Sequence, residues 1–489
     1  MTTTPPTAEF AESLRSASRR DPEAPAARQA QAAEVPVSAT DPLLRHLSDR
    51  AGGPAGRRLR PRRGAGGFWS IPRVLVALTV VGILLSALSG QYCRINGWGG
   101  VGVYHWGCYS DVAALWGSRD LNVSPWAPFS ADLASFEYPA ATMAVASFFA
   151  ALTHWLAETT GGYWGERGGL LYWDLTFLVA AVLWIALVLI TYVSAGRRPW
   201  DAAIVALSPA MIFAIGINWD IWPAVALALA VLLYQRKRWL WAGVLIGIGV
   251  AFKLYPLFML GAVLVLALRT ALRKQERNHD VDLVVFAKVA AGTLISWLVI
   301  NVPVMLINFE AWARFFVFSS ERGAGYSSLW HVWMVLGEGP TPETVSALSF
   351  GLFAASCAGV LVLGLTVSER PRMVQLLFLI VAAFLLFSKV YSPQFMLWLV
   401  PLIALAAPRL RDVVIWNAAQ VLHFWAVWMY LADVVGDHLP QHAFDAKLYV
   451  AAVILHMAST VYLMAQVIWD MARPQRDIIR AQQDLAAAA

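Results

Sequence analysis

The acidic residues between positions 91 and 169 are the first candidates for chemistry. Asp111 comes shortly after the first long apolar segment, and Asp120, Asp132 and Glu137 follow it. A carboxylate that is sheltered at a membrane surface can have a raised pKa and can then accept a proton as a general base. We therefore interpret Asp111 as a candidate catalytic base. The alternative is a solvated loop carboxylate, as most acidic residues in loops are.

Glu137 stands directly before Tyr138-Pro139 and a second apolar stretch. Proline is favoured in the first turn of a helix, and an acidic residue there interacts well with the helix dipole. Glu137 can therefore simply mark the start of a helix. The functional alternative is that it orders the loop around Asp111 or contacts a sugar hydroxyl, and both readings stay open.

Two lysines end long apolar segments in similar surroundings. Lys253 precedes Tyr255 in the sequence KLYP, and Lys389 precedes Tyr391 in the sequence KVYSPQ, which ends at Gln394. A lysine beside long apolar segments is unfavourable unless it is paired or reaches the interface. Two such lysines next to helix breaks would suit the phosphate of a lipid-linked substrate. The alternative is that both lysines only extend their ammonium groups to the membrane interface.

Further charged residues lie at other breaks between apolar segments. Asp220 follows Asn218-Trp219 and could pair with a lysine or hold a sugar. Segment 308–345 contains Arg322 and His331, either of which could meet a phosphate if the segment closed over a substrate. An interfacial helix held by aromatic side chains explains the same segment equally well.

The composition shows which elements must position these residues. Of 489 residues, 59% are hydrophobic and 14% are charged, whereas about 25% are charged in soluble domains. Apolar segments of near-spanning length recur along the chain, which is typical of a multispanning membrane protein. Because lipid cannot satisfy free backbone groups, the spans must be helices. The predicted fold class is therefore an all-α polytopic membrane protein.

The basic residues predict how the chain is oriented. The net charge is +6, and an arginine-rich segment before the first span indicates a cytoplasmic N-terminus rather than nucleic-acid binding. All basic clusters fall on the cytoplasmic side if the segment 138–156 does not cross. It would then be a juxtamembrane helix that either lies along the outer surface or dips into the membrane and returns. About twelve spans then remain, at 71–89, 170–193, 202–217, 221–234, 239–252, 256–268, 283–307, 346–367, 373–388, 395–407, 413–431 and 448–469.

This orientation divides the chain into three parts. Residues 1–67 lack sustained apolar periodicity and are predicted to be a disordered cytoplasmic tail. Residues 68–470 form the transmembrane domain, with 91–169 as the first outer loop and 308–345 as the second large one. Residues 471–489 are the predicted cytoplasmic C-terminal tail. We expect a multi-pass protein of the plasma membrane whose active site lies on the outer face.

The three cysteines form no CxxC pair. Cys93 and Cys108 both fall in the first outer loop, where disulfides persist. A bridge between them would tie the start of the loop to the segment before Asp111. Cys357 lies inside a predicted span and is interpreted as a packing residue.

Several short motifs together resemble a known family. They are Tyr-Ser-Asp at 109–111, Glu-Tyr-Pro at 137–139, Asn-Trp-Asp at 218–220, Lys-Leu-Tyr-Pro at 253–256 and Ser-Lys-Val-Tyr-Ser-Pro-Gln at 388–394. In this order they are similar to the family 87 integral-membrane glycosyltransferases of the GT-C superfamily, which include actinobacterial mannosyltransferases. The resemblance covers residues 71–470.

The resemblance implies a GT-C fold and a specific chemistry. A sugar, mannose by family membership alone, would pass from a polyprenyl-phosphate donor to a glycolipid or cell-envelope polysaccharide, with inversion and Asp111 as the base. No cofactor or metal is implied, and Ser110 before Asp111 is not acidic. We interpret as substrate-binding residues Glu137, Asp220, Lys253, Tyr255, Arg322, His331, Lys389, Tyr391 and Gln394. The alternative function is a lipid-linked sugar flippase, although no internal repeat is evident.

Overall fold

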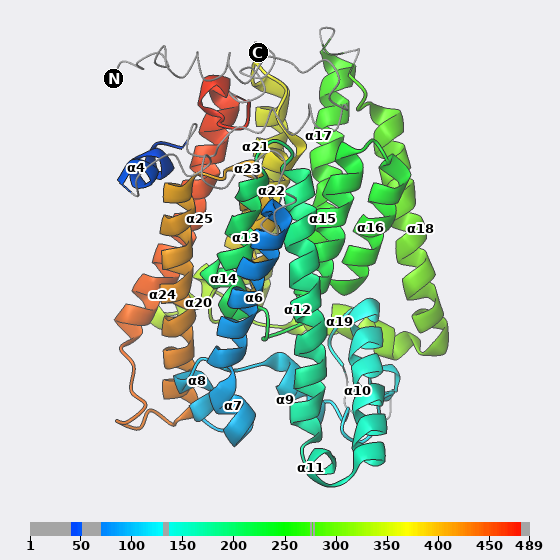
Figure 1. The fold of residues 1–489 in the computed structure, drawn as a ribbon, viewed down its shortest axis with the longest axis vertical. Coiled ribbons are helices and arrows are strands. Elements are labelled where there is room, and N and C mark those ends of the chain that lie inside the picture. Colours follow the sequence, from blue (N-terminus) through cyan, green and yellow to red (C-terminus); the bar gives the residue numbers. More distant parts are fainter. Residues whose placement is uncertain (1–40, 51–69, 131–135, 274–275, 277–278, 481–489) are drawn as a thin grey trace.

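The computed structural model describes residues 41–50, 70–130, 136–273, 276 and 279–480 (Figure 1). These residues form helices and contain no strand. Six long helices run through the bundle: α6 (Ile71–Ser89), α12 (Gly168–Ser194), α18 (Leu283–Ile307), α21 (Pro342–Thr366), α24 (Leu410–Val435) and α25 (Ala446–Ala472). The predicted all-helical fold is thus confirmed for the described part of the chain.

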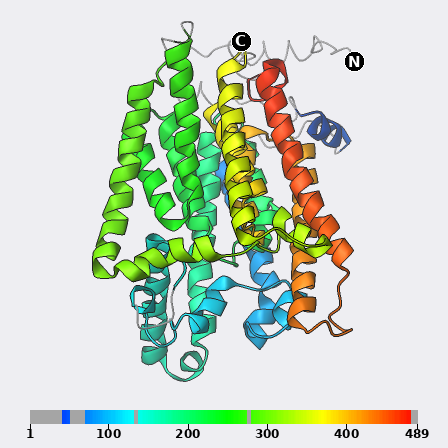
Figure 2. The ribbon, with the colours of Figure 1, turned by 180° about the vertical axis from the view of Figure 1, so that it is seen from behind.

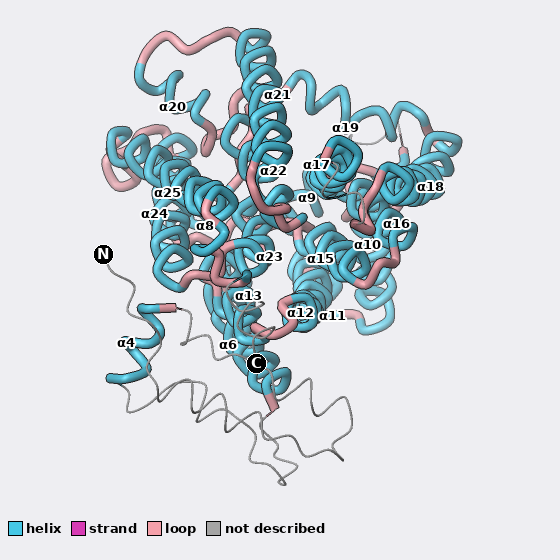
Figure 3. Tube along the Cα trace, turned by 90° about the horizontal axis from the view of Figure 1, so that it is seen from above, coloured by secondary structure: helices cyan, strands magenta, loops and turns pink. Residues whose placement is uncertain are grey.

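Shorter helices and 3₁₀ turns fill the space between the long ones. In chain order they are η2 (Pro199–Ala202), α13 (Ala203–Leu207), α14 (Pro209–Ala214), α15 (Ile221–Gln235), α16 (Trp239–Phe252), η3 (Tyr255–Leu257), α17 (Phe258–Leu272), α22 (Met373–Phe387), η5 (Pro393–Phe395) and α23 (Met396–Ala406). Every residue of α23 is buried. Seen along the bundle, α23 lies in its interior and packs against α12–α15 and α22 (Figure 3).

The predicted first outer loop folds as a helical layer at one end of the bundle. It contains α7 (Gln91–Asn96), α8 (Gly102–His105), α9 (Asp111–Ser118), η1 (Ala127–Phe129), α10 (Ala140–Thr160) and α11 (Gly162–Gly165). α4 (Pro42–Arg50) and the C-terminal end of α25 lie at the opposite end (Figure 1). α19 (Phe309–Glu321) runs across the bundle helices and is followed by α20 (Leu329–Leu336) (Figure 2). The 3₁₀ turn η6 (Pro474–Arg476) follows α25.

The count of twelve spans stays a prediction. Among the described residues, eight helices are long and apolar enough to cross a membrane, and shorter apolar helices accompany them. The predicted span 202–217 differs from the structure, which divides it into η2, α13 and α14. Pro209 explains the break, because the residue before a proline is disfavoured in the helical conformation. Ser208 is accordingly extended, with φ −61° and ψ 124°.

The helix α10 corresponds to the stretch 138–156 that we expect not to cross. It begins after Pro139, two residues later than expected, and its length and composition alone would also allow a span. In Figure 1 it lies beside the lower part of α12, near α9 and α11, and does not follow the full length of the bundle. This position agrees with a surface-layer helix.

Residues 41–50 are part of the tail that is predicted to be disordered, but they form the helix α4 and its cap. The rest of this tail lies outside the described residues. Asp41 accepts hydrogen bonds at Oδ1 from the backbone nitrogens of Leu43 and Leu44, at 3.0 and 3.2 Å. Its Oδ2 accepts one from the Leu410 nitrogen at 2.8 Å. One buried carboxylate therefore caps both α4 and α24, which fixes α4 to the bundle.

Glycines allow α16 and α18 to approach closely. A Cβ added at Gly243 or Gly247 would come within 3.0 Å of backbone atoms of α18, and one added at Gly292 would meet α16 in the same way. Gly243 and Gly247 are spaced as in the GxxxG pattern, by which membrane helices pack backbone to backbone.

We expect Gly247→Ala to destabilise the protein by about 1–3 kcal/mol, because the added methyl group overpacks this contact. The measurement is the thermal unfolding midpoint of the purified protein in detergent. Gly351→Ala in α21 is the matched control, since a Cβ there meets no atom within 4 Å. Equal midpoints for the two variants would contradict the role assigned to this contact.

Candidate active site

Asp111 is the first residue of α9, and the start of this helix is attached to the connection between α14 and α15. The Asp111 nitrogen donates to the Ile217 carbonyl at 2.8 Å. Ser110 Oγ donates to the Gly216 carbonyl at 2.7 Å. These bonds join two segments that lie far apart in the sequence, and they place Asp111 beside Asn218.

Four side chains from four segments converge on the Asp111 carboxylate. Tyr109 donates its hydroxyl to Oδ1 at 2.9 Å, and Asn218 donates its amide to Oδ2 at 2.7 Å. Tyr138 and Gln394 reach the same Oδ2 over longer distances of 3.5 and 3.4 Å. Asn218 also donates to the Tyr138 hydroxyl at 2.8 Å. The carboxylate is therefore held in a defined orientation.

The two tyrosines are suited to remain donors. Burial raises the pKa of Tyr109, and the neighbouring Asp111 raises it further. Burial likewise places the pKa of Tyr138 well above its usual value. Both phenols thus stay protonated at neutral pH.

Lys253 and Asp220 form an ion pair next to this group. The Lys253 Nζ lies 3.3 Å from Asp220 Oδ1, which also accepts a hydrogen bond from the Trp398 indole at 2.7 Å. Asp220 is fully buried, and its Oδ2 has no hydrogen-bond partner in the described part of the chain. Lys253 also lies over the rings of Tyr138 and Phe395, at 5.5 and 5.3 Å from their centres. Tyr138 therefore contacts both the carboxylate and the cation.

Tyr255 contributes aromatic stacking rather than a hydrogen bond. Its ring stacks on Trp398 with ring centres 4.2 Å apart, and Phe395 stacks on the same indole at 4.2 Å. The Tyr255 hydroxyl is buried without a partner among the described residues. The stack supports the indole that holds Asp220.

Glu137 is engaged in a different contact. Both of its carboxylate oxygens accept hydrogen bonds from the Arg119 guanidinium, at 2.6 and 2.7 Å. Because α10 begins at Ala140, Glu137 lies before the helix rather than in its first turn. The pair ties residue 119 to the segment that carries Tyr138. This contact fits the ordering of the loop better than contact with a sugar.

Other residues expected to bind substrate lie outside this cluster. Lys389 donates to the Ser320 carbonyl at 2.9 Å and to Ser346 Oγ at 3.3 Å. Its position links the 388–394 turn to the 308–345 segment instead of presenting a cation to Asp111. No hydrogen bond or ion pair joins Lys389 to the Asp111 cluster in the described structure.

The remaining candidates are also held by aromatic neighbours. The His331 ring packs near Tyr326, with ring centres 4.8 Å apart. Tyr391 packs between Phe395 and His456. Arg322 is exposed and packs on the Phe318 ring at 5.7 Å, within electrostatic range of Tyr109. Asp132 lies outside the described residues.

Sequence reasoning missed several neutral hydrogen-bonding residues of the site. Tyr109, Tyr138 and Asn218 each stand one or two residues from a candidate acid, within the motifs at 109–111, 137–139 and 218–220. Trp398 follows Gln394 by one helical turn. Their position within the same motifs is the signal that could have identified them.

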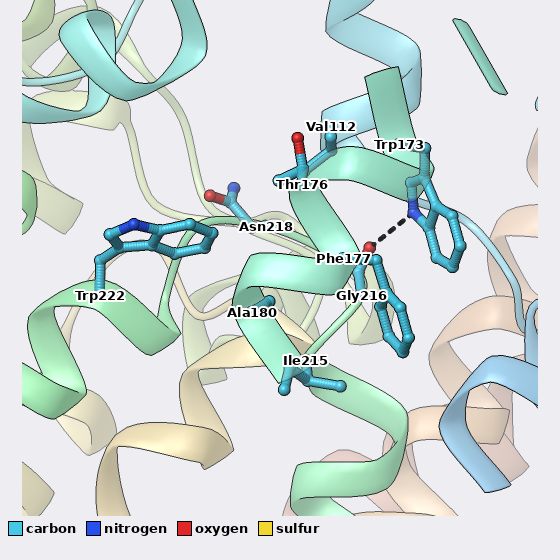
Figure 4. Close-up of a pocket in the computed structure, with 9 residues that line it drawn as sticks. All are labelled: Val112, Trp173, Thr176, Phe177, Ala180, Ile215, Gly216, Asn218 and Trp222. Atoms are coloured by element: carbon cyan, nitrogen blue, oxygen red, sulfur yellow. Dashed lines mark hydrogen bonds between the residues drawn. The ribbon is translucent and has the colours of Figure 1, made fainter. Parts of the chain in front are cut away.

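A small pocket lies directly behind Asn218 (Figure 4). It is lined by α12 side chains, including Trp173 and Phe177, and by Ile215, Gly216 and Asn218. Trp173 Nε1 donates to the Gly216 carbonyl at 3.2 Å, which braces the segment that holds α9. The space has room for about one water molecule. It cannot hold a sugar and is part of the packing around the site.

The expected disulfide is present between Cys93 and Cys108, with Cα atoms 5.9 Å apart. Both cysteines are buried, and the bridge closes the segment that contains α7 and α8. Cys108 is near Tyr109 and Asp111, so the bridge limits the movement of the chain that leads into α9.

We expect the double variant Cys93→Ser/Cys108→Ser to lose about 3 kcal/mol, the value for closing a loop of about 15 residues. Thermal unfolding without reductant would show a lower midpoint than the wild type. Adding reductant should lower the wild-type midpoint and leave the variant unchanged. An unchanged midpoint in the variant would show that the bridge contributes little. Cys357→Ser is the matched control, since Cys357 is free.

The fold and this cluster define the class of protein, a polytopic helical membrane protein with a positioned carboxylate beside a cation. Residues 217–468 match the family model described as mannosyltransferase (PIG-M). The chain belongs to this family, and it is a membrane hexosyltransferase of the GT-C type, as the motifs indicated. The matched region begins next to Asn218 and includes Asp220, Lys253 and Gln394, whereas Asp111 lies before it.

Curated sequences and solved structures add two findings. No curated protein sequence matches the chain. The solved structures with similarity include ArnT from Cupriavidus metallidurans bound to undecaprenyl phosphate, with a TM-score of 0.38 and 16% sequence identity. The match covers 84% of this chain and 77% of ArnT.

Proposed function

We propose that the chain transfers a mannosyl residue from a polyprenyl-phosphate donor to a hydroxyl group of a glycolipid or cell-envelope polysaccharide. Membership of the mannosyltransferase family supports the sugar. The observation that carries the proposal is the Asp111 carboxylate, oriented by Tyr109 and Asn218 next to the Lys253–Asp220 pair. A lipid-linked donor is consistent with a site that is built among membrane helices. The motif resemblance also supports a donor of this kind.

Asp111 acts in this mechanism as the general base, through its Oδ1 atom. A carboxylate oxygen accepts about two hydrogen bonds. Oδ2 already receives the amide of Asn218 and two longer contacts, whereas Oδ1 accepts one bond from Tyr109. Oδ1 therefore keeps a lone pair for the acceptor proton. The acceptor oxygen bonds to the anomeric carbon, and the carbon–oxygen bond to the phosphate breaks on the opposite face.

Lys253 stabilises the phosphate that leaves. The bond electrons move to the phosphate oxygen, and polyprenyl phosphate is released while the anomeric configuration is inverted. Such negative charge is best stabilised by a cation that is already oriented. Asp220 supplies that orientation, because its buried oxygen holds Lys253 Nζ at 3.3 Å. Arg322 is a second candidate contact for the donor, from the 308–345 segment.

The orientation in the membrane is part of the proposal. The basic segment before α6 supports a cytoplasmic N-terminus in the plasma membrane, and α9 lies at the opposite end of the bundle from α4 (Figure 1). The Asp111 cluster would then face the outer side. The alternative of a lipid-linked sugar flippase has no comparable support, because the family is one of transferases.

The test is direct transfer by the purified protein in nanodiscs. Radiolabelled polyprenyl-phosphate mannose is supplied with a membrane glycolipid extract, and the polyprenyl-phosphate glucose donor is run in parallel. We expect label in the glycolipid fraction with mannose, and inversion at the anomeric carbon by NMR of the product. The proposal would be overturned if neither donor supported transfer. It would also be overturned if the product retained the anomeric configuration.

A further inference from the structure

A second and larger pocket is lined by residues of α9, α10 and the start of α12. These helices belong to the helical layer at one end of the bundle (Figure 1). Its volume is about 260 Å³. The side chains that matter for its chemistry are Trp116 from α9, Asn122 from the following turn, Thr153 and His154 from α10, and Glu166 before α12. Nothing in the transfer mechanism above uses this pocket.

The size and charge of the pocket restrict what can bind there. Sites for small molecules typically measure ~300–1,000 Å³, so this volume suits a single small unit rather than a lipid chain. Of the described residues that line the pocket, none is lysine or arginine, and one is the acidic Glu166. A phosphate or an anionic headgroup would meet the Glu166 carboxylate and no lysine or arginine of the lining. The chemistry therefore favours a neutral, polar ligand.

The pocket offers hydrogen-bonding groups that remain available. The amide of Asn122 and the carboxylate of Glu166 have no hydrogen-bond partner in the described structure, and both side chains are exposed at the pocket. The His154 Nε2 atom lies 2.8 Å from the Leu121 carbonyl oxygen, which can only accept a hydrogen bond. Nε2 is therefore the nitrogen that carries the proton, and Nδ1 of the neutral ring is a hydrogen-bond acceptor. A hexose carries several hydroxyl groups that both donate and accept, which matches this mixture.

The location connects the pocket to the proposed reaction. Trp116 lies on the same helix as Asp111, about 7.5 Å further along the axis at 1.5 Å per residue. Its ring packs against His154 and Tyr172, with ring centres 5.3 and 5.0 Å away, so the position of this ring is supported from two sides. A glycan that places one unit in the pocket could present a neighbouring unit to Asp111.

We infer that this pocket binds a neutral hexose unit of the acceptor glycan. The inference rests on the proposed transferase function, which it deepens by assigning the acceptor to the glycan class. It also separates the two substrates in space. The donor phosphate lies with Lys253, among the membrane helices, and the acceptor is held by the α9–α12 layer.

A binding experiment tests the pocket independently of catalysis. The full-length protein in nanodiscs is titrated with methyl α-mannoside and with a synthetic α-mannobioside, and binding is followed by saturation-transfer NMR. We expect Asn122→Ala/Glu166→Gln to weaken binding by at least about 10-fold, which corresponds to about 1.4 kcal/mol. Glu158→Gln is the matched control, because it removes an exposed charge from α10 outside the pocket. Equal binding by the double variant and the wild type would overturn the inference. Displacement of the sugar by calcium ions would also overturn it, because the pocket would then be a cation site.

Transfer kinetics distinguish a failure of the pocket from a failure of the proposed function. In the double variant, we expect the acceptor KM to rise at least about 10-fold, with the donor KM unchanged. If the wild type transfers mannose but the acceptor KM is the same in the variant, only the pocket assignment is wrong. If the wild type transfers nothing while the sugar still binds, the proposed function is wrong and the pocket remains a sugar site.

Discussion

Replacing Asp111 with asparagine is expected to reduce sugar transfer by about 10²–10⁴-fold, the usual contribution of a general base. Asparagine has nearly the same shape, so Tyr109 can still donate to Oδ1. It cannot take the proton from the acceptor hydroxyl. The loss should therefore appear in kcat, while the donor KM changes little. The measurement is initial-rate transfer with saturating donor.

Two controls separate chemistry from folding in this variant. Polyprenyl phosphate should still raise the thermal unfolding midpoint of Asp111→Asn, because a ligand that binds the folded state stabilises it. Glu158→Gln, an exposed carboxylate on α10, should retain wild-type transfer. Undiminished transfer by Asp111→Asn would mean that another group removes the proton, and Oδ1 would then have only a structural role.

The sequence is informative about the site because ionisable residues are rare among membrane segments. Each charge next to an apolar segment needs a partner or a function, so Asp111, Asp220 and Lys253 stand out from the sequence alone. The structure brings these three together with Gln394. The neutral hydrogen-bond donors are harder to identify from the sequence. A tyrosine or asparagine at the end of a span has little energetic cost, so its presence does not indicate a partner or a function.

Local sequence is a poor guide to residues whose contacts depend on how segments meet. Lys389 resembles Lys253 in its local sequence, yet Ser320 and Ser346 take up its ammonium group. No local pattern distinguishes the two lysines, because the difference lies in which segment folds next to each. α4 is a similar case, since Asp41 depends on the backbone of Leu410, far along the chain. Pro209, by contrast, is visible in the sequence and breaks the predicted span for a local reason.

Lys253→Met is expected to reduce transfer by about 10²–10³-fold, because the leaving phosphate loses an oriented cation. The donor KM should rise while the acceptor KM stays constant. The substitution also leaves Asp220 buried without its partner, which typically costs ~3–5 kcal/mol of stability. Reduced transfer alone would therefore not show that Lys253 meets the phosphate. Lys237→Met supplies the matched control, since Lys237 pairs with Asp280 on the exposed surface and should change neither transfer nor stability.

The double variant Asp220→Asn/Lys253→Met resolves the ambiguity. Removing both charges together avoids an unpaired buried carboxylate, and Asn can still accept from the Trp398 indole. Stability should therefore return toward the wild-type value. If Lys253 acts on the donor phosphate, transfer stays low although the protein is again stable, and the donor KM stays high. If transfer recovers along with stability, the ion pair only holds α15 and α16 together, and the donor phosphate must be met by another cation, with Arg322 as the first to test.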